Sequence, residues 1–128
     1  MNQHARHILG TGHDLAKWRP QVERALKKGG GFMSFEQVAD AVDEGRMFMF
    51  DNGKSFVVVE PQEWDSGLHL HIMVGGGTQL GLEALEFVVR IWGRMIGATK
   101  LVTHCRPGFA RRVIKQGWKM PRIILEKE

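Results

Sequence analysis

The stretch LHLHIMVGGGTQLGLEAL, residues 68–85, decides which fold the chain can adopt. At its start, apolar residues alternate with His69 and His71, and this period of two predicts a β-strand. Gly75, Gly76 and Gly77 end the predicted strand, and apolar residues then recur at helical spacing. Residues 68–85 therefore predict a strand, a glycine turn and a helix. The free amides at such a helix N-terminus are a potential anion site, although glycines also serve simply to turn a chain.

Length and composition predict one globular domain over residues 1–128. The chain has 128 residues, 43% hydrophobic and 25% charged, which is ordinary for a protein with a single core. No apolar run approaches the roughly 20 residues that cross a bilayer, and the N-terminus lacks the apolar region of a secretory signal. The single Cys105 suits a reducing compartment. We therefore expect no membrane association and synthesis in the cytoplasm.

The formal net charge of +4 is compatible with nucleic acid, CoA-like phosphates or an acidic protein as partner. A role in binding nucleic acid is the least favoured, because aromatic residues are not interleaved with the basic ones. The basic segment that includes Arg111, Arg112 and Lys115 is typical of a solvated face. The chain contains no tyrosine, so this side chain cannot act as a general acid.

Other elements are predicted from periodicity and from capping signals. A weak strand at 7–12 precedes a helix at 15–28, which Pro20 either kinks or delays to a start at Arg19. Ser34 and Gln37 form a capping-box pattern at the start of a second helix. Asp51, Asn52 and Gly53 predict a hairpin turn. The turn joins strands at 47–50 and 55–60, and a polar loop at 61–67 leads into the central unit. A strand at 101–104, a helix at 107–116 and a strand at 122–125 come after that unit.

The order β-α-α-β-β-β-α-β-α-β predicts an α/β fold with a mixed, mostly antiparallel central sheet and helices on its faces. We expect the strand at 68–74 to be central and antiparallel to the strand at 55–60. The residues expected to be largely buried are Val88, Ile91, Trp92, Val102, Val113 and Ile124.

This order of elements resembles the GNAT (GCN5-related N-acetyltransferase) fold over nearly the whole chain. In that family a strand leads through a glycine-rich loop into a helix whose amides bind the pyrophosphate of acetyl-CoA, and residues 68–85 would form that unit. The chain resembles more closely a set of small GNAT-like proteins of tailed phages and prophages. The matching segments are residues 18–20, 35–46, 55–60, 69–76 and 106–118.

The resemblance implies a set of residues that would contact acetyl-CoA if it binds: Val74, Gly76, Gly77, Thr78, Gln79, Leu80, Gly81 and Leu82. The family's loop usually reads Arg/Gln-x-x-Gly-x-Gly/Ala. With the final glycine at Gly81, Gly76 takes the Arg/Gln place and Gln79 takes a glycine place. We expect the Gln79 side chain to crowd a pyrophosphate, and acetyl-CoA to bind weakly or not at all.

Three residues are candidate catalytic bases if the protein is an enzyme. His71 and His69 point to the same face of one strand, and an ordinary imidazole titrates near neutral pH, so either could deprotonate an amine. Glu60 ends a strand and is the third candidate. The alternatives are a polar face packed against a helix for the histidines and a solvated carboxylate for Glu60. No third ligand has convincing metal spacing, so no metal site is predicted.

The function expected first is that of a non-catalytic or degenerate GNAT-like phage protein, which serves virion structure or assembly through contacts with other phage or virion proteins. Such a protein would be found in the host cytoplasm during synthesis and then in the virion, and it could form a homo-oligomer. It would need no cofactor. Trp64 is the best contact candidate. The alternative function is an acyl-CoA-dependent N-acetyltransferase that uses acetyl-CoA.

Overall fold

A computed structural model describes residues 9–10, 12–29, 31–104, 111, 113–120 and 127. Its elements are β1 (Leu9–Gly10), α2 (Gly12–Lys17), α3 (Arg19–Lys28), α4 (Phe35–Asp43), β2 (Phe48–Asp51), β3 (Ser55–Trp64), β4 (Gly67–Gly77), α5 (Gln79–Met95) and β5 (Ala98–Thr103). The strands form one sheet in the order β1-β2-β3-β4-β5. All neighbouring pairs are antiparallel except β4 and β5, which are parallel. The predicted mixed α/β sheet is therefore confirmed.

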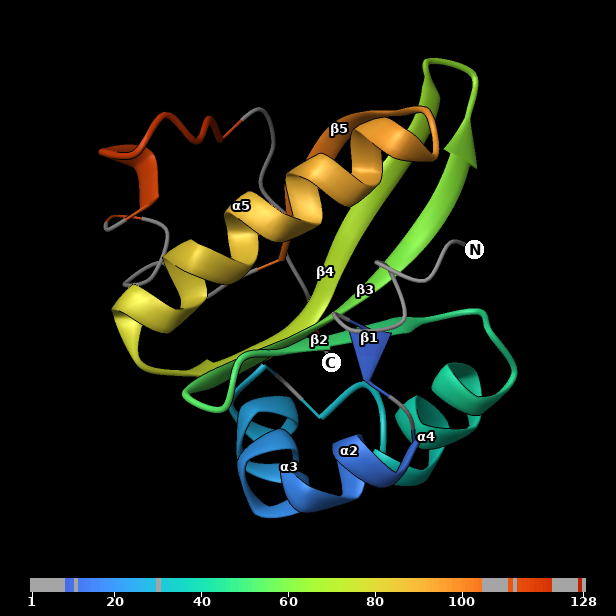
Figure 1. Ribbon diagram of the computed structural model, residues 1–128, viewed down its shortest axis with the longest axis vertical. Coiled ribbons are helices and arrows are strands. Elements are labelled where there is room, and N and C mark those ends of the chain that lie inside the picture. The colour runs from blue at the N-terminus through green and yellow to red at the C-terminus, as the bar shows by residue number, and fades with distance from the viewer. Residues whose placement is uncertain are drawn as a thin grey trace.

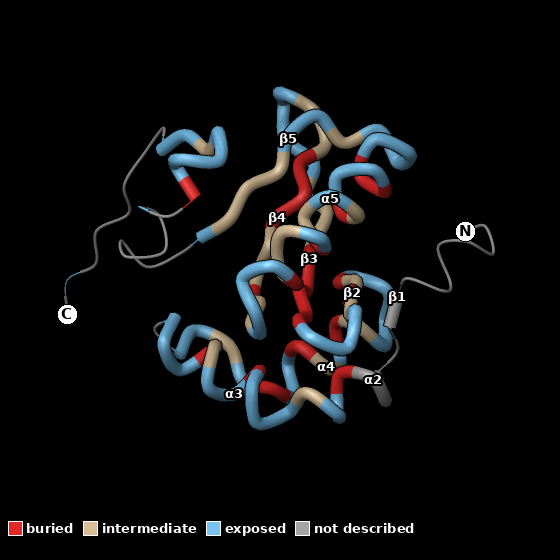
Figure 2. Tube along the Cα trace, turned by 60° about the vertical axis from the view of Figure 1, so that its left-hand side comes forward, coloured by how far each residue is buried: buried red, intermediate tan, exposed pale blue. Residues whose placement is uncertain are grey.

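The two faces of the sheet are covered by different helices (Figure 1). Phe56 and Val58 of β3 pack into a cluster with residues of α2, α3 and α4. Val57 and Val59, which alternate with them, pack against α5. Figure 2 shows the resulting run of buried residues along β3 and β4 between the helical layers. The continuous apolar run of β3 is thus explained by burial on both faces.

Local signals at the helix starts act as the sequence predicts. The Ser34 hydroxyl accepts a hydrogen bond from the Gln37 amide at 3.1 Å, and the Gln37 side chain accepts one from the Ser34 amide at 2.9 Å. This capping box satisfies amides at the start of α4 that have no partner within the helix. Pro20 lies in the first turn of α3, where a missing N–H costs nothing. The predicted first helix is accordingly divided at Trp18 into α2 and α3.

The polar loop predicted for residues 61–67 is wrong. β3 continues to Trp64, and Trp64 pairs directly with Gly67 at the start of β4. Gly67 has a φ of 117°, a backbone conformation that a side chain disfavours, so it suits the tight hairpin end. The pairing of two long strands outweighs the polar composition of this segment, because strand preference depends strongly on cross-strand context.

The prediction that Gly75, Gly76 and Gly77 end the strand is confirmed in part: β4 ends at Gly77, but it includes all three glycines and does not end at residue 74. Gly76 pairs with Phe56, and a Cβ atom on Gly76 would lie 3.0 Å from the Phe56 ring. The glycines therefore leave room for larger neighbours on β3 while they stay in the sheet. The predicted position of β4 beside β3, antiparallel and inside the sheet, is confirmed.

The expected core is confirmed in part. Trp92 and Val113 are buried, whereas Val88 and Val102 are only half-buried. Ile91 is 45% exposed, so its predicted burial is wrong. It lies two residues, or about 200° around the helix, from Val89, which faces the sheet. Ile124 and the predicted strand at 122–125 lie outside the described residues.

Among the described residues, none of the helices combines the length and the apolar character needed to span a bilayer. Residues 111, 113 and 114 are helical, in the segment predicted as a helix at 107–116.

Candidate functional site

The parallel strands β4 and β5 diverge where β5 ends. Their pairing reaches Ile72 and Thr103, but β4 continues for five further residues to Gly77. A bulge accompanies this point: Val58 pairs with Val74 and Val59 with Ile72, so Met73 is an additional residue in β4. A bulge bends its strand and increases its twist. In the described part of the chain, no strand pairs with the β5-facing edge of β4 beyond Ile72.

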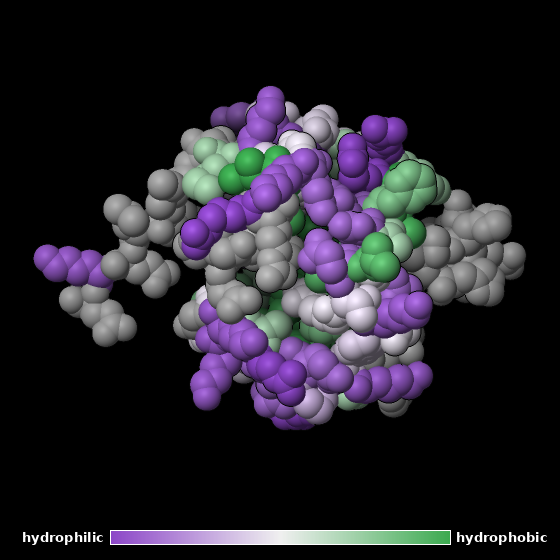
Figure 3. Space-filling view, turned by 90° about the vertical axis from the view of Figure 1, so that its left-hand side faces the viewer, coloured by the Kyte–Doolittle hydropathy of each residue, from purple (hydrophilic) through white to green (hydrophobic). Residues whose placement is uncertain are grey.

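A cleft of about 1070 Å³ opens between the diverging strands. Its lining comes from residues 72–77 of β4, the C-terminal half of α3, the first turns of α5, the end of β5 and the segment 113–118. Figure 3 looks onto this side of the molecule, where apolar surface lies in a hollow with hydrophilic side chains around its rim. The cleft is therefore lined both by the C-terminal part of β4 and by the first turns of α5.

The N-terminus of α5 lies beside this cleft and carries backbone amides for which the described part of the chain provides no acceptor. Thr78 is the N-cap: its hydroxyl accepts from the Gly81 amide at 3.0 Å, and its carbonyl accepts from the Leu82 amide at 2.9 Å. Among the described residues, no acceptor lies in hydrogen-bond contact with the amides of Gln79 and Leu80. The positive end of a helix with available amides favours an anion.

Gly81 is required by the packing of α5 against β3. It is buried, and a Cβ atom there would overlap the Ser55 hydroxyl and lie 2.8 Å from the Thr78 hydroxyl oxygen. Ser55 is fully buried and donates a hydrogen bond to the Thr78 carbonyl at 2.9 Å. The close approach of the first turn of α5 to β3 thus leaves no space for a side chain at this position.

The Gln79 side chain extends along α5. Its amide nitrogen lies 3.5 Å from a carboxylate oxygen of Glu83, one turn further along the helix. The same Glu83 oxygen accepts a hydrogen bond from Gln116 at 2.7 Å, which ties α5 to the segment 113–118. Arg24 and Lys28 of α3 also line the cleft. The cleft therefore contains cations from α3 and carboxylates, Glu83 and Glu86, from α5.

Five of the residues predicted to contact acetyl-CoA line the cleft: Val74, Gly76, Gly77, Gln79 and Leu82. Thr78 and Gly81 instead build the helix cap, and the Leu80 side chain is 79% exposed. Neither the contact with acetyl-CoA nor the crowding by Gln79 is tested by this geometry, and both stay predictions.

The predicted bases His69 and His71 lie together on the sheet face opposite α5, and both are buried. Their ring centroids are 6.3 Å apart, and each ring lies close to the Trp64 ring, at 6.2 Å and 6.4 Å. The Ser66 hydroxyl is 2.9 Å from Nε2 of His69. The two histidines therefore form a packed aromatic group with Trp64, and neither is among the described residues that line the cleft.

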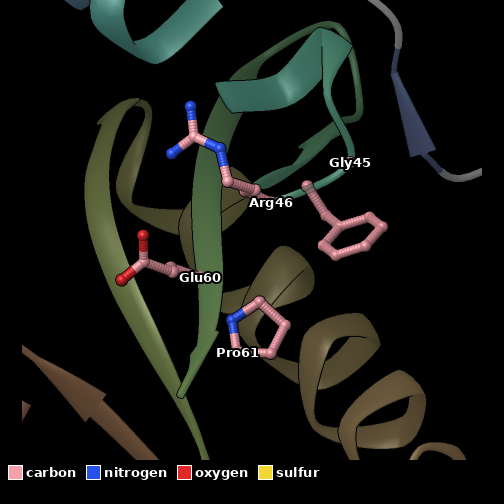
Figure 4. A pocket seen from close by; sticks show the side chains of 5 residues that line it. Gly45, Arg46, Glu60 and Pro61 are labelled. Atoms are coloured by element: carbon pink, nitrogen blue, oxygen red, sulfur yellow. The ribbon is translucent and has the colours of Figure 1, made fainter. Parts of the chain in front are cut away.

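Glu60 pairs with His71 across the β3–β4 hairpin, but its carboxylate lies in a different environment. It accepts a hydrogen bond from the Gln62 side chain at 2.6 Å. It also lines a shallow pocket of about 340 Å³ (Figure 4), where Glu60 and Pro61 of β3 lie beside Arg46. The structure therefore separates Glu60 from the large cleft.

His104 is a candidate that the sequence did not single out. It follows the last residue of β5, lines the cleft and is exposed, and its ring centroid lies 5.8 Å from that of His71. Its position directly after a short parallel strand was the available signal, because ligands bind at the carboxyl ends of such strands. Within the described residues, no group of three or more His, Cys, Asp or Glu side chains is placed to hold a metal ion.

Comparisons with known proteins identify the fold. A probable acetyltransferase of known structure superposes with a TM-score of 0.73 at 11% identity, and the match covers 94% of each chain. The chain has the GNAT acetyltransferase fold. No family model matches the sequence, and the search of curated proteins also finds no match.

Two other solved structures with this fold are similar over almost their whole length. An aminoglycoside N-acetyltransferase in complex with CoA has a TM-score of 0.66 at 13% identity, with 94% of this chain and 92% of that one covered. A ribosomal-protein-alanine N-acetyltransferase from Brucella melitensis biovar Abortus 2308 has a TM-score of 0.64 at 13% identity, with coverage of 91% and 97%. At these identities the likeness establishes the GNAT-like fold alone.

Proposed function

We propose that this GNAT-like protein is an acyl-CoA-dependent N-acyltransferase. The proposal is carried by one observation: among the described residues, the β5-facing edge of β4 has no partner strand beyond Ile72, and it leads along the cleft towards the amides of Gln79 and Leu80, which have no acceptor there. The pantetheine arm of CoA is an extended chain with amide groups, so it can hydrogen-bond to a strand edge as an added strand does. A pyrophosphate at its end would then meet the positive end of α5. The orientation of Gln79 along the helix, towards Glu83, supports access to these amides.

The cleft also offers residues for the chemistry of acyl transfer. A bound acyl-CoA would supply a thioester: an amine would attack its acyl carbon to form a C–N bond, the C–S bond would break, and CoA would leave as a thiolate that takes up the proton released by the amine. His104 lies where β4 and β5 diverge, and its imidazole would take the proton that the amine loses on attack. Arg24 and Lys28 would face the phosphates across the cleft. The acceptor amine belongs on the side of the cleft where His104 is exposed.

A second candidate function is favoured by the carboxylates in the cleft. Glu83 and Glu86 line it from the first two turns of α5, where they would repel a pyrophosphate. Gly76 and Gln79 also depart from the family's loop pattern. A GNAT-like protein with these features that has lost acyl transfer would act through protein contacts. The resemblance to tailed-phage proteins makes virion assembly or structure the role to test.

Isothermal titration calorimetry with acetyl-CoA separates the two functions. We expect micromolar affinity, and we expect Lys28→Glu to weaken it about tenfold, because reversing one partly solvated charge near a phosphate changes binding by about 1.4 kcal/mol. Lys27→Glu is the matched control: Lys27 is the exposed neighbour in the same turn and does not line the cleft. Its affinity should equal that of the parent protein within about twofold.

A second measurement follows the thiol released from acetyl-CoA in the presence of a panel of amines. His104→Ala should slow this release about a hundredfold or more, the usual effect of losing a general base, while the binding heat stays unchanged. No binding heat with acetyl-CoA at hundreds of micromolar, together with no thiol release, would reject the enzyme and favour the second candidate.

A further inference from the structure

The outward face of α5 presents a continuous apolar stripe. Leu80, Phe87, Ile91 and Met95 follow one another at helical spacing, and they are 79%, 66%, 45% and 61% exposed. Ala84, also exposed, lies between them on the same face. The other large hydrophobic residues exposed in the described chain are Phe32, Trp64, Ile96, Ile114 and Met120, which are dispersed over other segments or follow the helix. A contiguous exposed patch of this kind marks an interaction site more often than scattered residues do.

The charged side chains beside the stripe change sign along the axis of α5. At 100° per residue, Glu83, Glu86, Arg90 and Arg94 all fall on one flank of the stripe. The carboxylates occupy the N-terminal half of α5 and the guanidinium groups the C-terminal half. The opposite flank contains Trp92 and Val88, which turn towards the sheet. One flank of the stripe is therefore negative at one end and positive at the other.

We propose that this stripe binds a second copy of the chain, with the two α5 helices antiparallel about a two-fold axis perpendicular to them. This axis places the charged flanks of both copies on the same side of the helix pair, and the two helices run in opposite N-to-C directions. Glu83 of one copy, whose Oε1 also accepts a hydrogen bond from Gln116 of its own chain, then lies nearest to Arg90 and Arg94 of the other. A parallel arrangement would instead place each charged flank against the uncharged flank of the partner. The charge pattern of α5 therefore complements itself only in the antiparallel pairing.

The apolar residues match in the same register. When Phe87 of each copy lies near the axis, Leu80 of one copy meets Met95 of the other, and Ala84 meets Ile91. The 17 residues of α5 make a face about 25 Å long. One helix pair of this length lies near the lower limit of about 1,000 Å² for specific interfaces. We therefore expect a dimer whose population depends on protein concentration, and the pairing does not depend on acyl-CoA binding.

Sedimentation equilibrium of the full chain over a range of concentrations tests the pairing. The parent protein forms a dimer, and Phe87→Glu weakens it at least about a hundredfold, because it removes two central aromatic contacts and brings two carboxylates together. Phe87 is exposed, so the melting temperature of the monomer should not fall. Phe32→Glu changes a phenylalanine of similar exposure, 55%, outside the stripe and leaves the dimer intact. A monomer at every concentration, or a dimer that survives Phe87→Glu, overturns the proposal.

The direction of the pairing is tested by charge reversal and cross-linking. Arg94→Glu weakens the dimer about tenfold, and Glu83→Arg in the same chain restores it. In a Cys105→Ser background, a mixture of Leu80→Cys and Met95→Cys chains forms a mixed disulfide under mild oxidation. Disulfides between two Leu80→Cys chains in place of the mixed product would show parallel helices and would overturn the antiparallel arrangement.

Discussion

Gly81→Ala should destabilise the protein even though alanine is the better helix former. The new methyl group overlaps the buried Ser55 hydroxyl, and overpacking of this kind costs about 1–3 kcal/mol. If Ser55 moves away, its 2.9 Å hydrogen bond to Thr78 is lost, which costs about 1 kcal/mol more. The helix propensity of alanine offsets up to about 1 kcal/mol. The net loss of about 2 kcal/mol should lower the melting temperature by about 8 °C.

Urea and thermal unfolding of a double-mutant cycle test this reasoning. Ser55→Ala alone should cost about 1 kcal/mol, but combined with Gly81→Ala it removes the closest of the three short contacts and leaves those with the Thr78 hydroxyl at 2.8 Å and the Cβ of residue 55 at 2.9 Å. The two losses should therefore fall short of additivity by about 1 kcal/mol. Gly29→Ala is the matched control. Its φ is −83° and its Cβ would have its nearest contact at 3.4 Å, so its stability should change by less than about 0.5 kcal/mol. A Gly81→Ala protein as stable as the parent, or strictly additive losses, would refute the packing argument.

Three further stability predictions can be checked by the same unfolding measurements. Ser34→Ala removes the N-cap of α4 and should cost about 1 kcal/mol. Leu70→Ala leaves a cavity beneath α5 and should cost about 2–5 kcal/mol, whereas Ile91→Ala on the outward face should cost less than about 1 kcal/mol. Asn52→Ala removes the side chain that accepts from the Ser55 amide and donates to the Gly81 carbonyl, and it should cost about 1–2 kcal/mol.

The parts of the fold that the sequence predicts well depend on short-range physics. The capping box at Ser34 and Gln37 and the hairpin turn at Asn52 and Gly53 are satisfied by atoms three or fewer residues apart. The alternation around His69 and His71 correctly placed both on one face of β4. Signals of this kind are complete within a short window of sequence, so they need no knowledge of tertiary contacts.

The predictions that are wrong depend on contacts distant in sequence. Residues 61–64 look polar but pair as a strand because the hairpin arm of β4 is available beside them. In α5, one apolar set that includes Val89 faces the sheet and another that includes Ile91 faces outwards, and both satisfy helical spacing. Periodicity alone therefore could not tell which face is buried. His104 lines the cleft because β4 and β5 diverge there, whereas the local sequence indicates only that it follows a short strand.

The glycines of the β4–α5 junction illustrate why a motif can mislead about function. A side chain at Gly77 would meet the backbone of Lys54, and one at Gly81 would meet Ser55, so both glycines are needed by the fold whether or not a ligand binds. Their presence is therefore no argument for acetyl-CoA. Under the proposed function, affinity would depend on two further features: the β5-facing edge of β4, which has no partner strand beyond Ile72 among the described residues, and the balance between Lys28 and the carboxylate of Glu83 in the same cleft. The Lys28→Glu titration measures that balance directly, because it changes the charge and leaves every glycine in place.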